Sequence, residues 1–382
     1  MTVESAGAPL REGKILSIEQ LRGVAALAVV VCHVGGHFYG FDRFSPGPAK
    51  LFGWLGEWGV ALFFVISGFC IRLPMARARA LDPGARLDAG EFVAHRFLRI
   101  APPYWLAIAA SIGAGMLMRT ELIDGSHRPL DVGLHVLALH TLWAPSFNSI
   151  NGVFWTIGIE VHFYAAYLLL ANRRLGWPTF AVLLVLGLIV FAAASMTLAG
   201  DWRTVGQEIF ITAFWQWCLG AMLADWCVRA RPQAARTPLT AARGGVILLS
   251  LAMGLIDPRV LGLHLMPWAL PFAAAAIVGL FVVRPRDGPR ATGPLSAGLS
   301  WLGRISYSLY LFHPVALSLV AWAQTRGLLA APAGPAAEVA GALALAWASY
   351  RLVERPLLAW RARLKSTVAA RQGPDIPDAA AA

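Results

Sequence analysis

Apolar runs of about twenty residues, separated by short arginine-rich stretches, dominate this 382-residue sequence. A helix needs about twenty apolar residues to cross the hydrocarbon core of a bilayer. Only 14% of the residues are charged and the mean hydropathy is +0.61, so charged side chains are too few to cover a soluble globule. The pattern predicts an all-α integral membrane protein with about ten transmembrane helices, at residues 15–38, 53–72, 99–118, 153–170, 177–199, 208–228, 244–257, 263–283, 299–322 and 335–353.

A further apolar stretch, Leu130–Trp143, has about fourteen residues, a length typical of a re-entrant or interfacial segment. If this stretch does not span, the loops on one side of the membrane carry 22 Lys and Arg residues and the other side carries 7. If it spans, the split becomes 11 against 18, with the basic loops outside. Because cytoplasmic loops are enriched in Lys and Arg, the first arrangement is favoured, and it predicts that both termini are cytoplasmic.

The chain divides into three parts on this basis. Residues 1–14 form a cytoplasmic N-terminus, residues 15–357 form one membrane domain, and residues 358–382 form a cytoplasmic tail. The tail is rich in Ala, Pro, Gln and Asp without an apolar pattern, so we expect it to be disordered. The first apolar run contains Arg22 and is interpreted as a retained helix rather than a cleavable signal peptide.

Composition and motifs also exclude other classes of protein. The net charge of +11 would suggest nucleic-acid binding in a soluble protein, but here it lies between apolar runs, where membrane topology explains it. We therefore expect no nucleic-acid partner. The four cysteines show neither CxxC nor zinc-site spacing, so we expect no metal site. Phosphate-binding glycine loops, GxSxG and HExxH are absent from the sequence.

Ionisable residues inside apolar helices are costly and indicate functional sites. The first predicted helix carries Arg22 and His33, which lie three turns apart on one face, about 16 Å along the axis. Arg22 lies near the cytoplasmic end and His33 towards the outer side. The alternative is a snorkelling arginine and a structural histidine.

The fourth predicted span places Thr156, Glu160 and Tyr164 on one face. Glu160 lies at a depth comparable with that of His33, and a buried carboxylate needs a partner or a proton. Pairing His33 with Glu160 would satisfy both groups and would tune the imidazole as a general base. A purely structural ion pair is the alternative.

Arginines gather at the cytoplasmic mouth of the third span. Arg96 and Arg99 lie one turn apart there, and Arg72 ends the preceding helix. Guanidinium groups bind phosphates through two parallel hydrogen bonds, so these residues are candidates for a phosphate site. Topology alone would also place arginines at this mouth.

A second polar stripe lies in the ninth span, where Ser306, Tyr310 and His313 share one face. Pro314 follows His313 and can kink the helix and free a carbonyl group. We expect this stripe to face the same cavity as the first-helix residues, with His313 ranked below His33 because a histidine before proline is also commonly structural.

Several of these segments together resemble the acyltransferase-3 family of integral membrane O-acyltransferases, in the form without a fused extracytoplasmic domain. The matching blocks occur in order across residues 17–357. They are Ile18 to Ala26 with His33, Gly59 to Phe69, Arg96 to Ile100 with Pro103 and Tyr104, Trp155 and Thr156 with Glu160 and Phe163 and Tyr164, Leu302 to Pro314, and Val353 to Pro356.

The resemblance implies transfer of an acyl group, most often acetyl from acetyl-CoA, to a hydroxyl of a carbohydrate or glycolipid. It implies no permanently bound cofactor, with acyl-CoA as co-substrate, and a location in the bacterial inner membrane. In the family, the spaced arginine and histidine that match Arg22 and His33 are regarded as essential. Together with the physical argument above, the resemblance assigns catalytic roles to His33 and Glu160. It assigns acyl-CoA binding to Arg22, Arg72, Arg96, Arg99 and Tyr104, and a substrate pocket to Ser67, Trp155, Tyr164, Ser306, Tyr310 and His313.

The sequence departs from the family pattern after Glu160, where Val161 and His162 replace a second acidic residue that the family often has. His162 is therefore an additional candidate proton carrier. Three other functions stay open at this point. One is a proton-coupled transporter or flippase, another is a membrane-embedded sensor or assembly subunit without catalysis, and the third is acylation of a small natural product such as a macrolide.

Overall fold

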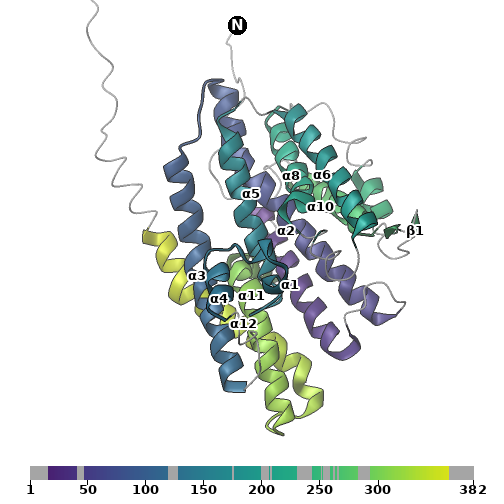
Figure 1. Cartoon of the computed structure of the whole chain (residues 1–382), viewed down its shortest axis with the longest axis vertical. Helices are drawn as coiled ribbons and strands as arrows, with labels where there is room; N and C mark the ends of the chain where they lie inside the picture. The colour runs from purple at the N-terminus through teal and green to yellow at the C-terminus, as the bar shows by residue number, and fades with distance from the viewer. Residues whose placement is uncertain are drawn as a thin grey trace, which may run out of the picture.

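The computed structural model describes residues 16–40, 47–118, 128–173, 176–198, 206, 209–229, 243–250, 252, 259–260, 263–264, 266–282 and 293–360. These residues form an elongated bundle of helices (Figure 1). The bundle helices are α1 (Leu16–Tyr39), α2 (Pro48–Leu81), α3 (Ala89–Met118), α5 (Trp155–Ala171), α6 (Trp177–Thr197), α8 (Phe210–Arg229), α10 (Met266–Val282), α11 (Pro294–Thr325) and α12 (Gly334–Ser349).

Smaller elements connect the bundle helices. They are α4 (Arg128–Val136), the 3-10 turns η1 (His140–Leu142), η2 (Ala144–Ser146) and η3 (Ala331–Ala333), and the π-helical turn η4 (Tyr350–Glu354). A hairpin of two-residue strands, β1 (Arg259–Val260) and β2 (Leu263–His264), precedes α10. The expected all-α architecture therefore holds for the described residues apart from this short hairpin, which the sequence pattern did not predict.

Helix α2 lies at the centre of the bundle. It packs against α1 on one side and against α8 and α10 on another, while α11 packs against both α1 and α12 (Figure 1). Glycines permit the closest of these approaches, because a Cβ at Gly68 would overlap the carbonyl oxygen of Trp217, and one at Gly220 would overlap that of Val65. Small residues at helix interfaces are the usual means of close packing between membrane helices.

Five helices are long and apolar enough to cross a membrane by length and composition, namely α1, α2, α3, α6 and α11, and α5 and α10 are shorter apolar helices. The chain is therefore a multi-pass membrane protein. Several helices extend beyond the predicted apolar ranges; α2 continues to Leu81 and α3 begins at Ala89. These extensions contain charged residues. Hydropathy marks only the apolar part of a helix, so it did not predict them.

The predicted span at 244–257 is described only in part, with residues 243–250 helical and most of the remainder outside the described residues. The predicted N-terminal region 1–14 also lies outside them. Of the predicted disordered tail, residues 358–360 are helical, because the helix that follows η4 continues to residue 360. Residues 361–382 lie outside the described residues.

The stretch Leu130–Trp143 folds into the nine-residue helix α4 and the turn η1. Nine residues extend about 14 Å, so α4 alone is too short to cross a bilayer. Ala138 (φ 56°) and Ile150 (φ 57°) adopt left-handed backbone conformations in this region. Such conformations cost about 1–2 kcal/mol for residues with a side chain, so tertiary contacts must hold this segment in place.

Candidate active site

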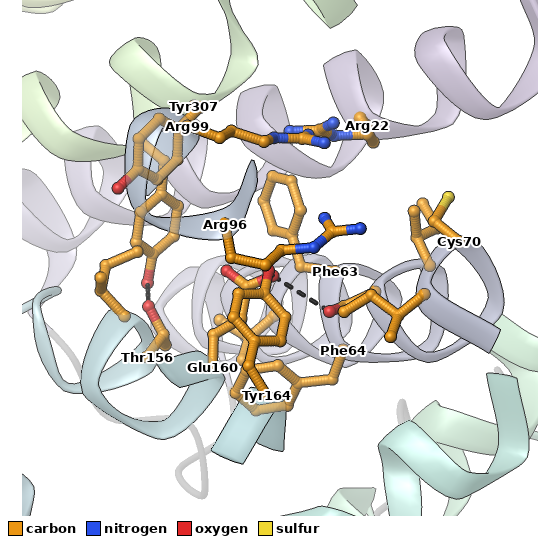
Figure 2. Close-up of a pocket in the computed structure, with 16 residues that line it drawn as sticks. Arg22, Phe63, Phe64, Cys70, Arg96, Arg99, Thr156, Glu160, Tyr164 and Tyr307 are labelled. Carbon is orange, nitrogen blue, oxygen red and sulfur yellow. Dashed lines mark hydrogen bonds between the residues drawn. The ribbon is translucent and has the colours of Figure 1, made fainter. Parts of the chain in front are cut away.

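A cavity of about 700 Å³ lies between α1, α2, α3, α5 and α11 (Figure 2). Seven of the catalytic, donor-binding and pocket residues expected from the sequence line it, together with apolar side chains of α2 and α5. The seven are Arg22, Ser67, Arg96, Arg99, Glu160, Tyr164 and Tyr310. Helices far apart in the sequence therefore bring much of the predicted set together in one space.

Positive charge dominates the cavity wall. Figure 2 shows the guanidinium groups of Arg22, Arg96 and Arg99 reaching into the cavity. Arg96 lies over the rings of Phe92 (5.5 Å) and Tyr164 (5.4 Å), which fixes its direction. Within the described part of the chain, none of the three arginines forms an ion pair within 4.0 Å. Unpaired guanidinium groups in a semi-enclosed space provide favourable sites for an anion.

Among the described residues that line this cavity, Glu160 provides the single carboxylate. It accepts hydrogen bonds from the Ser67 hydroxyl (3.0 Å) and from the Tyr164 hydroxyl. The sequence hypothesis paired this carboxylate with His33, but neither of its hydrogen bonds in the described structure comes from that imidazole. The hypothesis failed because Glu160 reaches α2 and its own helix, whereas the His33 side chain points towards α11.

His33 instead contacts His313. Its Nδ1 lies 2.8 Å from the Val29 carbonyl and 3.3 Å from Nε2 of His313, and the ring centroids are 4.8 Å apart. His313 is fully buried, and its Nδ1 lies 2.8 Å from the Tyr310 carbonyl. The pair lies beside the cavity rather than in its wall, since Tyr310 is a wall residue and its ring lies 6.0 Å from that of His313.

The hydrogen bonds assign the tautomers of both rings. A carbonyl oxygen can only accept, so Nδ1 carries the hydrogen in His33 and in His313. Nε2 of His313 then accepts from Nδ1 of His33, and Nε2 of His33 carries the lone pair that a general base needs. The side chain that accepts a hydrogen bond from the His33 ring is thus His313, and not Glu160 as expected from the sequence.

Arg72 does not line the cavity, contrary to its proposed place in the phosphate site. Its Nε donates to Oδ1 of Asp225 on α8 at 2.8 Å, and both side chains are only 3% exposed. The guanidinium also lies 5.3 Å from the ring centroid of Phe180. A buried charge needs a partner. We therefore interpret this ion pair as a structural contact that joins α2 to α8.

Four other candidates also lie outside this wall. Tyr104 is buried among the apolar side chains of the core, and the buried Ser306 hydroxyl donates to a carbonyl within its own helix. His162 stacks on Phe210 at 5.3 Å, which directs it towards α8. Trp155 lines a second cavity beside the first.

The sequence did not single out several residues of the arginine-lined cavity, notably Phe63, Cys70 and Tyr307. The Tyr307 hydroxyl donates to the carbonyl of Ile100 at 3.0 Å and so ties α11 to the part of α3 that carries the arginines. A signal for it did exist in the sequence. Tyr307 precedes Tyr310 by three residues, and residues three apart lie on the same face of a helix.

These features define a predominantly helical, multi-pass membrane protein with an arginine-lined cavity and a neighbouring histidine pair. The family model described as an acyltransferase domain matches residues 15–351. The chain belongs to this acyltransferase-3 family of membrane proteins.

Two relatives are similar over most of their length. The exopolysaccharide production protein ExoZ of Rhizobium meliloti is 30% identical over 316 residues, covering 80% of this chain and 90% of ExoZ. BcsY of Komagataeibacter xylinus, which carries the provisional name membrane-bound transacylase, is 28% identical over 384 residues, covering 93% of this chain and 85% of BcsY. No solved structure matches the chain.

Proposed function

We propose that this protein is a membrane O-acyltransferase that moves an acyl group from cytoplasmic acyl-CoA to a hydroxyl of a carbohydrate or glycolipid. Acetyl is the acyl group that we propose. The observation that carries the proposal is the convergence of Arg22, Arg96 and Arg99 on one cavity without ion-pair partners among the described residues. Acyl-CoA is the anionic donor that such a cavity suits. The name of ExoZ supports a polysaccharide-related acceptor.

The proposed orientation places the arginine-lined end of the bundle at the cytoplasm of a bacterial inner membrane, with both termini on that side and ten spans in total. The charge distribution of the loops supports this orientation. In it, the phosphates of CoA bind Arg22, Arg96 and Arg99, and the pantetheine arm extends along the cavity past Ser67 and Glu160. Arg72 is left out of the donor site because Asp225 holds it.

In the proposed reaction the acceptor hydroxyl oxygen attacks the thioester carbonyl carbon. A carbon–oxygen bond forms, the carbon–sulfur bond breaks, and the hydroxyl proton ends on the CoA sulfur. His33 removes the proton through Nε2, and its Nδ1 hydrogen is then shared between the Val29 carbonyl and His313 Nε2. Both are acceptors, so both stabilise the imidazolium that forms.

Glu160 has a different proposed role from that of His33. Its hydrogen bonds to Ser67 and Tyr164 order the cavity wall beside the arginines. Its negative charge also offsets part of their positive charge when no donor is bound.

Binding of acetyl-CoA to the purified protein tests the donor site. Arg99→Ala should raise the dissociation constant of acetyl-CoA about tenfold or more. Arg99→Lys should restore little of the lost affinity, because an ammonium cannot make the two parallel contacts of a guanidinium. The exposed Arg86→Ala is the matched control. Equal binding by Arg99→Ala and Arg86→Ala would remove the basis of the proposal.

A further inference from the structure

A second cavity, of about 550 Å³, lies between α2, α5, α6, α8 and α10. Its polar side chains are Glu57 and Gln216, and its aromatic ones include Trp155. Oε1 of Gln216 is buried and has no hydrogen-bond partner among the residues that the structure describes. An unmet buried acceptor beside an open space indicates a missing donor.

The two cavities are neighbours along α2. Val60 and Phe64 line both, and at α5 Trp155 lines the second cavity while the next residue, Thr156, lines the first. From Glu57 to Cys70 the two cavities together follow about 20 Å of α2.

The second cavity also lies at the opposite end of the bundle from the arginines. Gly35 and Phe52 approach one another, as do Ala25 and Gly59, so α1 and α2 run antiparallel. Arg22 lies near the beginning of α1, whereas the second cavity is lined from the beginning of α2, at Glu57, and from the beginnings of α5, α8 and α10. The two cavities therefore face opposite ends of the helices.

The two cavities also differ in charge. The first presents three arginines, whereas among the described lining residues of the second the ionisable side chain is Glu57. A carboxylate accepts hydrogen bonds from neutral hydroxyl groups. Gln216 offers a further acceptor, and the indole of Trp155 offers an apolar face. This set suits a neutral polyhydroxylated ligand.

We propose that the second cavity binds a sugar unit of the acyl acceptor, with Glu57 and Gln216 accepting hydrogen bonds from its hydroxyls and Trp155 packing against its ring. This assignment rests on the proposed acyl transfer. Val60 and Phe64 line both cavities, so only these side chains separate a hydroxyl of the bound sugar from the space proposed for the thioester. That hydroxyl forms the ester bond as the carbon–sulfur bond breaks, and its proton passes through His33 to the departing thiolate.

The first experiment measures acetyl transfer from acetyl-CoA to methyl glucoside, galactoside and mannoside by protein in lipid nanodiscs, with the esters detected by mass spectrometry. Glu57→Gln and Gln216→Leu should each raise the KM for the glycoside about tenfold, the effect of one lost hydrogen bond to a buried group. The KM for acetyl-CoA should stay within twofold. Trp177→Phe replaces a tryptophan that lines neither cavity and is 47% exposed, so it should change neither value.

The second experiment does not depend on turnover. Gln216→Cys should gain one maleimide label over the wild type by intact mass, and the methyl glycosides should slow that labelling. Acetyl-CoA turnover without glycoside acetylation, unchanged glycoside KM in both variants, or an equal rise in both KM values would overturn the sugar site. If the wild type consumes no acetyl-CoA, the proposed function fails, and the labelling decides the cavity assignment: protection supports it and lack of protection refutes it.

Discussion

The ion pair of Arg72 and Asp225 separates packing from donor binding. Nε and Oδ1 are 2.8 Å apart, a second contact joins Nη2 and Oδ2 at 3.4 Å, and both side chains are 3% exposed. Arg72→Ala leaves the Asp225 carboxylate buried without this partner, which costs about 3–5 kcal/mol of unfolding free energy. Arg72→Met combined with Asp225→Leu should recover much of that loss, because no unpaired charge stays buried.

Unfolding by SDS in mixed micelles measures these free energies, and acetyl-CoA binding is measured on the same samples. The dissociation constant should stay within twofold of wild type in the double variant, since Arg72 does not line the arginine-lined cavity. A stable double variant that loses acetyl-CoA binding would refute this reasoning and return Arg72 to the donor site.

The histidine pair, a buried histidine of η1 and the segment around α4 give three more predictions. In steady-state kinetics, His313→Ala should lower kcat about tenfold or more and leave acetyl-CoA binding intact. Glu160→Gln should change the KM for acetyl-CoA more than kcat. The reverse pattern would restore Glu160 as the partner of the base. Burial, aided by a neighbouring histidine, lowers the pKa of His140 from 6.5 to about 3, so the folded state binds fewer protons and loses stability as pH falls from about 6.5 towards 3; melting curves of His140→Phe should lose part of this acid sensitivity, and an unchanged pH dependence would contradict it. Cysteine accessibility should place Asp124 and Ser149 on the same outer side, and labelling from opposite sides would show that Leu130–Trp143 spans.

The length and position of the apolar runs were sufficient to predict these helices. The predicted ranges coincide with α1, α2, α3, α5, α6, α8, α10, α11 and α12 to within a few residues at most ends, because an apolar run of this length has few other stable folds in a bilayer. The exceptions are the charged extensions of α2 and α3, where helix formation outside the apolar range depends on side chains that hydropathy does not read.

Side-chain pairing was less predictable than helix position. Spacing placed Glu160 at the depth of His33 but could not give the rotation of one helix about its axis relative to another, and that rotation decides that His313 rather than Glu160 meets His33. A usable signal did exist for Arg72, since Asp225 is an acidic residue within an apolar run and needs a cationic partner.

Glu338 on α12 is likewise a buried acid, 1% exposed, and its partner is His37 of α1 at 2.8 Å. This is a histidine–glutamate pair of the kind expected from the sequence, one helical turn beyond His33 and with a different acid. The sequence pattern did not predict this pair, because which histidine meets which acid depends on how the helices pack together.

Turnover of radiolabelled acetyl-CoA by purified protein in nanodiscs, with a glycan acceptor, tests the central claim most directly. The wild type should release CoA thiol in step with labelled ester. Folded His33→Ala should still bind acetyl-CoA and should lose about 10²–10⁴ in rate. Absence of thioester consumption by the wild type would contradict the acyltransferase proposal, and near-normal turnover by folded His33→Ala would contradict the assignment of the base.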